Sequence, residues 1–283
     1  MRALVPLCLL LACSAEPRTE PRANERITLA TAPYTLAPGE EKYLCYATTL
    51  AGDREIAVNG FTSDAGALVH HVVLSYTTSP EPDGVSECAV RFKPTWFPLF
   101  EIGRSSGNLS LPAGTAMRFR GQQLLIQLHL VNATKASVTE TSRIHLETLD
   151  PATKTTNAGI YGFDNRVFSI PPKSMGTSAE MSCTMTRDMT VFAVLGHMHA
   201  RGSRIELMRG DAVLFATDWS FDVQPTTPLA IQVHKGDNIR LRCTWTNDGD
   251  TVVGYGERAS DEMCSLIWYY TPYEALDGCA KAP

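Results

Sequence analysis

The chain lacks a basic run, a long apolar segment and a CxxC pair, and each absence argues against one class of function for the protein. Its net charge is −5, and without clustered lysine and arginine it has no electrostatic surface for nucleic acid. The apolar run at residues 4–12 is too short to span a bilayer as a mature helix. Without CxxC spacing, a thiolate metal cluster is disfavoured.

Long helical patterns are also absent, and short segments with alternating or β-branched residues are frequent. The chain has 283 residues, 44% hydrophobic and 19% charged, which is enough to bury cores in two domains. Turn residues separate the strand-like segments, which predicts an all-β fold of two tandem antiparallel β-sandwich, jelly-roll-like domains. The clearest segments are 67–76, 122–131, 143–149, 190–199, 204–208, 238–246 and 264–270.

A polar stretch at residues 150–157 (DPATKTTN) interrupts the strand rhythm, and we place the domain boundary there. The N-terminal β-sandwich is predicted to cover residues 28–153 and the C-terminal one residues 154–283.

The N-terminus has the pattern of an export signal over residues 1–12. Leu10-Leu11-Ala12-Cys13 resembles a bacterial lipobox, which implies cleavage before Cys13 and a lipid anchor on its sulfur. A plain secretory signal cut nearby is the alternative. Residues 13–27 are polar and suit a flexible tether. We expect an exported protein, lipid-anchored in the bacterial cell envelope (periplasm or outer membrane) or secreted, that meets membrane only through this anchor.

Six cysteines remain beyond the signal: Cys45, Cys88, Cys183, Cys243, Cys264 and Cys279. An even number in an exported chain predicts structural disulfides. If the two halves fold separately, Cys45 pairs with Cys88, and the other four retain three alternative pairings.

His197, Met198 and His199 end the apolar run VFAVLGHMH. In a strand, residues i and i+2 point to one face, so the two imidazoles are aimed together and Met198 points away. Met263 lies between Glu262 and Cys264. A disulfide at Cys264 would hold the methionine rigidly, and the acidic neighbour would orient a histidine.

The first half carries His70-His71 and a lone His129 in an apolar strand. Adjacent residues in a regular strand face opposite ways, so His70 and His71 bind one metal ion only at a bulge or a strand end. Without companions, His145 and His234 are expected to be structural.

The candidate ligands fall into two groups, His70, His71 and His129 in one half and His197, His199 and Met263 in the other. Imidazole suits several transition metals, whereas a thioether is a soft ligand that favours Cu(I). Zinc sites use Cys, His and carboxylates. This distribution predicts a protein with two copper ions and a redox function.

These residues resemble the motifs of the copper type II ascorbate-dependent monooxygenases, a family that includes peptidylglycine α-hydroxylating monooxygenase and dopamine β-monooxygenase. The resemblance covers nearly the whole mature chain. It is carried by residues 42–45 (KYLC), 69–72 (VHHV), 125–129 (LIQLH), 181–183 (MSC), 191–193 (VFA) with the H-x-H, 242–243 (RC), 260–264 (SDEMC) and 268–270 (WYY).

The resemblance implies that the copper at the three-histidine group stores an electron. The copper at His197, His199 and Met263 is implied to be the catalytic one, where O₂ binds and a substrate C–H bond is attacked. The two sites are implied to face each other across a solvent-filled cleft between the domains, with ascorbate as reductant. Gln127 matches a glutamine near the first site, and Tyr43 also matches. The implied disulfides are Cys45–Cys88, Cys183–Cys279 and Cys243–Cys264.

Two positions depart from the peptidylglycine enzymes, which hold the substrate carboxylate with an arginine and a tyrosine. Here these positions are Leu195 and Ile267. An unpaired carboxylate in an apolar site is strongly disfavoured, so a more apolar or neutral small molecule is expected as substrate.

The sequence thus predicts a monomeric copper monooxygenase whose partners are a small-molecule substrate and a reductant. The alternatives are a non-catalytic copper-binding envelope lipoprotein and a β-sandwich surface protein with incidental histidines.

Overall fold

The computed structural model describes residues 24–50, 55–88, 93–103, 107–120, 123–274 and 277–281. All regular structure in these ranges is β-strand, which confirms the all-β prediction. No helix in the described ranges has the length and apolarity needed to cross a membrane. The predicted signal segment, Cys13 and most of the tether lie outside the described residues, and the first strand begins at Arg26, within the predicted tether.

The N-terminal half contains two large sheets. The outer one has the order β1 (Arg26–Ala30), β12 (Arg143–Leu149), β4 (Glu55–Asp64), β9 (Thr115–Arg120) and β13 (Thr156–Asn157), with β8 (Gly107–Ser110) also paired to β4. The inner one has the order β6 (Gly84–Glu87), β3 (Glu41–Thr49), β10 (Gln123–Val131), β5 (Val69–Thr77) and β7 (Trp96–Ile102). A short ladder joins β11 (Val138–Glu140) to β2 (Tyr34–Leu36).

The C-terminal half repeats this plan. Its inner sheet has the order β20 (Thr227–Val233), β17 (Met189–His197), β23 (Ser265–Thr271), β14 (Gly159–Asn165) and β24 (Asp277–Lys281). Its outer sheet has the order β16 (Ser174–Thr184), β21 (Asn238–Asn247), β18 (Gly202–Arg209) and β19 (Ala212–Asp218), and β15 (Ser169–Ile170) pairs with β22 (Val253–Gly254). The strand β13 belongs to the outer N-terminal sheet, and β14 belongs to the inner C-terminal sheet. The exact domain boundary, between residues 153 and 154, stays a prediction.

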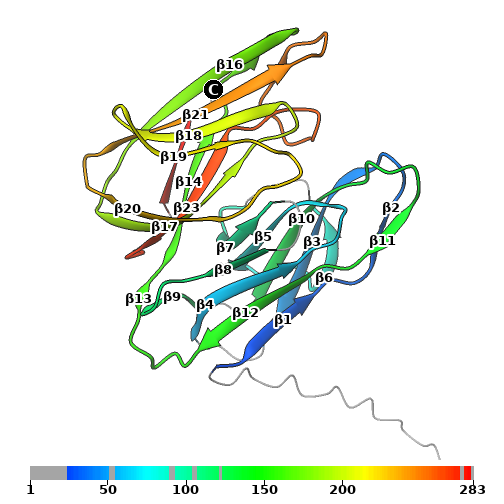
Figure 1. The fold of residues 1–283 in the computed structure, drawn as a ribbon. Coiled ribbons are helices and arrows are strands. Elements are labelled where there is room, and N and C mark those ends of the chain that lie inside the picture. Colours follow the sequence, from blue (N-terminus) through cyan, green and yellow to red (C-terminus); the bar gives the residue numbers. More distant parts are fainter. Residues whose placement is uncertain are drawn as a thin grey trace, which may run out of the picture.

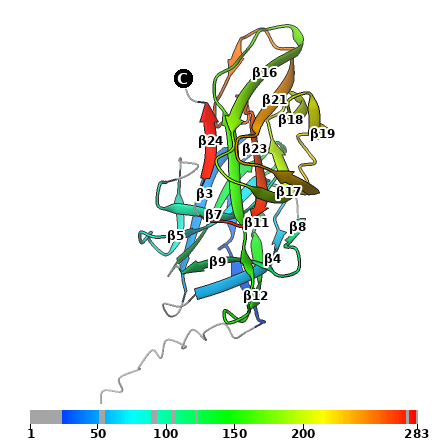
Figure 2. The same cartoon turned by 90° about the vertical axis from the view of Figure 1, so that its left-hand side faces the viewer.

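The two inner sheets lie between the two outer ones, as both views show (Figures 1 and 2). The strand β23 explains this arrangement, because its residues are buried on both faces. Leu266, Trp268 and Tyr270 pack into the C-terminal core. Ile267 and Tyr269, on the alternate face, belong to an apolar cluster built mainly from the N-terminal half. The interface between the halves is therefore a continuation of the N-terminal core.

The structure contains the three disulfides that the resemblance implies. One joins Cys45 in β3 to Cys88 after β6, and another joins Cys183 in β16 to Cys279 in β24. The third joins Cys243 in β21 to Cys264, the residue before β23. Such bridges persist in oxidising compartments, which indicates an exported protein.

Candidate metal centre

Five buried histidines meet where the two inner sheets face each other. His70, His71 and His129 come from β5 and β10, His197 ends β17, and His199 lies just beyond that strand. Two groups have their ligand nitrogens within 4.8 Å of one another: His70, His71 and His129, and His70, His197 and His199. All five side chains belong to residues that are at most 3% exposed.

A bulge brings His70 and His71 to one site. The pairing of β10 with β5 matches His129 to His71 and then Leu130 to Val69, so His70 is the extra residue. An extra residue re-aims side chains locally, which is the condition that two adjacent histidines require to share a metal ion. The ring centroids of His70 and His71 lie 5.4 Å apart.

His129 is held by two residues of β3. Its Nε2 lies 2.8 Å from Glu41 Oε1, and its ring stacks on Tyr43 with a centroid distance of 4.3 Å. Tyr43 is the direct cross-strand partner of His129, which explains the stacking. The hydrogen bond with His129 holds the pKa of the Glu41 carboxyl below its usual value, so the carboxyl accepts as an anion.

The other ring nitrogen of His129, Nδ1, is buried and makes no hydrogen bond to any described residue. Burying a polar nitrogen without a partner costs free energy, whereas a metal ion would satisfy it. Together with a donor set made of imidazoles, this atom shows that the residues fit a transition-metal ion such as copper.

His197 and His199 are oriented through their Nδ1 atoms. His197 Nδ1 lies 3.1 Å from Gln224 Oε1, and His199 Nδ1 lies 3.1 Å from the Asp261 carbonyl. Because both acceptors are carbonyl oxygens, Nδ1 carries the proton and Nε2 carries the lone pair in each ring. Gln224 is 3% exposed and donates from Nε2 to the Phe221 carbonyl. No pattern in the sequence marks Gln224, which lies in an irregular connection between β19 and β20.

Glu262 ties the H-x-H segment to Met263. Its carboxylate accepts from the backbone N–H groups of His199, Arg201 and Met263 and from Trp245 Nε1. Burial raises the pKa of Glu262, while these four donors favour the ionised form. Met263 is fully buried between Glu262 and the disulfide-bonded Cys264. Its role as a ligand stays a prediction. Met198 packs in the C-terminal core instead, as the strand geometry requires.

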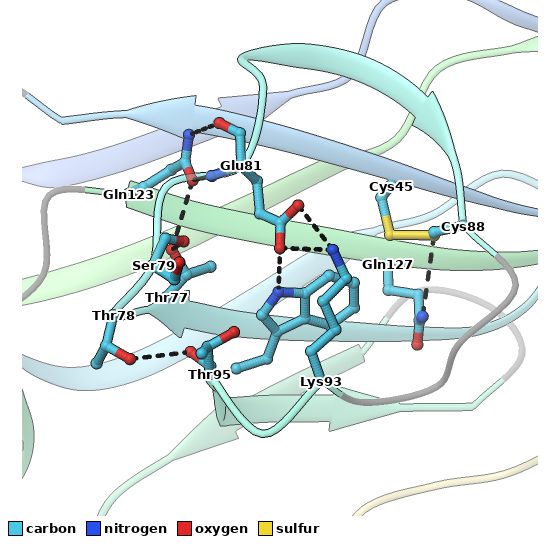
Figure 3. Close-up of polar contacts among 11 residues, drawn as sticks. Cys45, Thr77, Thr78, Ser79, Glu81, Cys88, Lys93, Thr95, Gln123 and Gln127 are labelled. Atoms are coloured by element: carbon cyan, nitrogen blue, oxygen red, sulfur yellow. Dashed lines mark hydrogen bonds and ion pairs between the residues drawn. A yellow bond between two sulfur atoms is a disulfide. The ribbon is translucent and has the colours of Figure 1, made fainter.

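Gln127 lies on β10 two residues before His129, on the same face of the strand. Its Nε2 lies 3.9 Å from Cys88 Sγ, so it contacts the Cys45–Cys88 disulfide (Figure 3). In register, Gln127 is paired with Cys45. The residue is therefore placed between this disulfide and the three-histidine group.

The two histidine groups lie closer together than the family resemblance implies, since the resemblance implies a solvent-filled cleft between them. The ring centroid of His70 lies 5.2 Å from that of His197 and 5.3 Å from that of His199, so the two groups are in contact and buried. Contacts between the halves account for this closed arrangement. Tyr43 Oη donates to the Glu257 carbonyl at 3.0 Å, and the Ala259 N–H donates to Glu41 at 2.7 Å.

A short segment of the C-terminal half covers the histidines. The ring centroid of Phe221 lies 4.6 Å from that of His70, in the other half. Trp219 Nε1 donates to the His199 carbonyl at 2.9 Å. The two remaining histidines lie elsewhere: His145 contacts Thr28 on exposed β1, and His234 is exposed near Asp188.

Comparisons with known proteins agree with this chemistry. A family model described as the C-terminal domain of copper type II ascorbate-dependent monooxygenases matches residues 156–282. Peptidyl-glycine alpha-amidating monooxygenase A of Xenopus laevis is 26% identical over 251 residues, covering 81% of this chain and 26% of that protein. The chain thus spans about a quarter of the length of this relative.

Among solved structures, the major capsid protein P2 of bacteriophage PM2 aligns with a TM-score of 0.33 and 9% identity, covering 87% of this chain and 97% of that one. Allantoicase aligns with a TM-score of 0.24 and 12% identity, covering 74% and 78%. Similarity at this level carries no functional argument.

Proposed function

We propose that the chain is a member of the copper type II ascorbate-dependent monooxygenase family and that it hydroxylates a C–H bond of a small organic substrate with O₂ and ascorbate or a similar reductant, and the family model over residues 156–282 and the Xenopus laevis relative support this. The observation that carries the proposal is the meeting of two buried histidine groups that share His70 and draw on both halves of the chain. A buried polar nitrogen without a hydrogen-bond partner, such as His129 Nδ1, costs free energy, whereas a cluster of imidazoles is an ordinary ligand set for copper.

Two copper ions at these residues would each supply one electron and together the means to activate O₂. The protein's part is to hold the rings and exclude water. Gln224 and the Asp261 carbonyl fix the tautomers of His197 and His199. Glu41 and Tyr43 fix the His129 ring. Met263 is the proposed sulfur ligand at the second site, in a position that Glu262 and Cys264 make rigid.

The proposed substrate is not a peptidylglycine. Leu195 and Ile267 are cross-strand partners on the face of the inner C-terminal sheet that meets the N-terminal half. Leu195 is 2% and Ile267 9% exposed. A substrate carboxylate placed against this pair would lose its hydration without gaining a cation there, which costs several kcal/mol. An apolar or neutral molecule meets no such penalty.

We also propose that the protein is a monomer held in a bacterial envelope through a lipid on Cys13. The three disulfides support export, and the lipobox-like sequence supports the anchor. Its partners are then the substrate and the reductant alone.

The test is anaerobic reduction of the copper-loaded protein with ascorbate, followed by ¹⁸O₂ and a panel of neutral small molecules. Incorporation of ¹⁸O into one product at the expense of one O₂ is the expected result. Binding of two copper ions without ¹⁸O in any product would contradict the enzyme.

A second function, copper binding without catalysis, is favoured by the closure of the site, since all five histidines are nearly inaccessible. Oxygen uptake separates the two. An enzyme consumes O₂ steadily and stops when its substrate is withdrawn, whereas a copper-binding protein consumes one stoichiometric amount and then stops.

A further inference from the structure

One glycine of the inner C-terminal sheet has no backbone reason to be glycine. Gly162 lies in the middle of β14, and its φ is not positive. A Cβ added there would meet no atom within 4 Å. Its parallel-strand partner Gly278 is different, because a Cβ there would approach the Gly162 carbonyl at 3.0 Å. Glycine weakens a strand interior, and its presence often marks a place where a ligand comes close.

The open space over Gly162 is part of a pocket between the two inner sheets. The pocket has a volume of about 450 Å³, which is the size of a small organic ligand site. Gly162 and Gly278 form its floor, and Ile160 and Ile267 stand beside them on the same sheet. Trp96 and Pro98 of β7 face them from the N-terminal half. We call this space the glycine pocket.

The walls of the glycine pocket are apolar, and charges at its edge are paired within the protein. Lys93 Nζ lies 2.8 Å from Glu81 Oε1, a contact visible in Figure 3. Arg166 Nε lies 2.7 Å from Asp164 Oδ2, and Ser265 Oγ donates to the other oxygen of Asp164. A charged ligand would have to compete with these partners, whereas an uncharged one would not.

The pocket and the metal centre share one sheet face. Ser265, in the pocket wall, is the cross-strand partner of His197, and Ile267 is the partner of Leu195. Gly162 pairs with Ile267 on the next strand. Because neighbouring strands are about 4.8 Å apart, Gly162 lies two strands, or about 10 Å, from Leu195. Ile267 stands between Gly162 and Leu195, so the pocket ends beside the residues that adjoin the histidine strand.

We propose that the glycine pocket binds a small uncharged apolar molecule, with one end toward Ser265, the cross-strand partner of His197. Binding follows from the pocket alone. The assignment of this molecule as the substrate rests on the proposed monooxygenase function, and the experiment below keeps the two separate.

The test uses the full chain, with and without bound copper, and toluene as the probe. Binding is followed by saturation-transfer NMR and by titration calorimetry. The wild type is expected to bind toluene in both metal states, and to bind benzoate and benzylamine at least tenfold more weakly. Glu101 also lines the pocket, so tighter binding of benzylamine would overturn the uncharged class.

The variants Gly162→Ala, Gly162→Val and Gly162→Leu fill the pocket in steps. Because their Cβ meets no neighbour, they should fold with an unchanged or higher Tm while toluene affinity falls progressively, by at least tenfold for Leu. Val213→Leu on exposed β19 is the control and should bind as the wild type does. Unchanged toluene affinity in folded Gly162→Leu, or no binding by the wild type, would overturn the pocket. Binding without hydroxylation of any bound compound would count against the monooxygenase and leave the pocket standing.

Discussion

At the scale of single residues, the protein fixes which ring nitrogen of a histidine carries the proton. His197 and His199 each have Nδ1 against a carbonyl oxygen, whereas His129 has Nε2 against a carboxylate. His129 therefore presents Nδ1 to the metal centre, whereas His197 and His199 present Nε2. Ring tautomers set in advance lower the cost of organising ligands when a metal ion binds.

Met263 provides a direct test of the ligand set. In Met263→Leu, the X-ray absorption spectrum of the copper(I)-loaded protein should lose its sulfur contribution and keep its nitrogen contribution. The volume of the side chain is nearly conserved, so the folding cost should stay below about 1.5 kcal/mol.

Met198→Leu is the matched control for this substitution. Met198 is also fully buried, lies between the two histidines and packs in the C-terminal core. Its replacement should leave the sulfur contribution intact. A sulfur signal that survives in Met263→Leu and disappears in Met198→Leu would reverse the assignment.

Gln224 should act through His197 alone. Removing its side chain in Gln224→Ala frees the His197 imidazole to rotate and to change tautomer. The affinity for one copper ion should therefore fall by about 10- to 100-fold. Competition with a copper(I) chelator measures this loss. Gln232→Ala, on β20, is the control, since the exposed side chain of Gln232 accepts a hydrogen bond from Thr190, away from the histidines. Equal affinities in the two variants would remove Gln224 from the centre.

At the scale of strands, the sequence predicted most of what places the histidines. The segment 143–149 is β12 as observed, and 122–131 matches β10 to within one residue. A bulge, one of the conditions under which His70 and His71 could share a metal ion, is present. These features could be predicted because alternation, turn residues and the steric rule for adjacent side chains are all local properties of the sequence.

Contacts between distant strands could not be predicted from the sequence in the same way. Gln224, Phe221 and Glu41 belong to connections or strand ends with no pattern of their own, and only the fold brings them to the histidines. The disulfide pairs beyond Cys45–Cys88 likewise needed the family resemblance. The contact between the two histidine groups was predicted by neither, since it depends on how the inner sheets pack.

The connection before β7 contains Glu81, whose contacts predict how the stability of the protein depends on pH. Glu81 accepts from Lys93 Nζ and Trp96 Nε1, and its backbone groups bond with Gln123 (Figure 3). The hydrogen bond from Lys93 holds the pKa of Glu81 below its usual value of 4.5. A lowered pKa contributes stability above pH 4.5, and that contribution is lost as the pH falls through the lowered value.

In Glu81→Gln, the Tm should therefore be lower than that of the wild type at pH 7, and the difference should vanish in acid below the lowered pKa. Lys93 is 44% exposed, so solvent limits the loss at pH 7 to about 1 kcal/mol. Thermal unfolding at a series of pH values measures it. Glu87→Gln, at an exposed glutamate, is the control for loss of a surface charge and should keep the Tm of the wild type at pH 7. A Tm difference that grows in acid would contradict the stated sign.

At the scale of the whole molecule, the two halves share one apolar cluster. Ala193, Leu195, Ile267 and Tyr269 of the C-terminal half pack with the N-terminal core. Tyr269 Oη accepts from the Glu101 N–H at 3.0 Å and donates to its carbonyl at 3.1 Å. The histidines and the glycine pocket lie in the same interface between the halves.

This sharing predicts that both halves unfold in a single calorimetric transition, in the absence of copper as well as in its presence. Leu195→Glu should split it into two, because a carboxylate buried in the cluster costs several kcal/mol and weakens the interface more than either core. Val213→Glu, on a residue that is 57% exposed, should keep the single transition. Two well-separated transitions in the wild type would show instead that the halves dock weakly and that the closed contact between the histidine groups is easily opened.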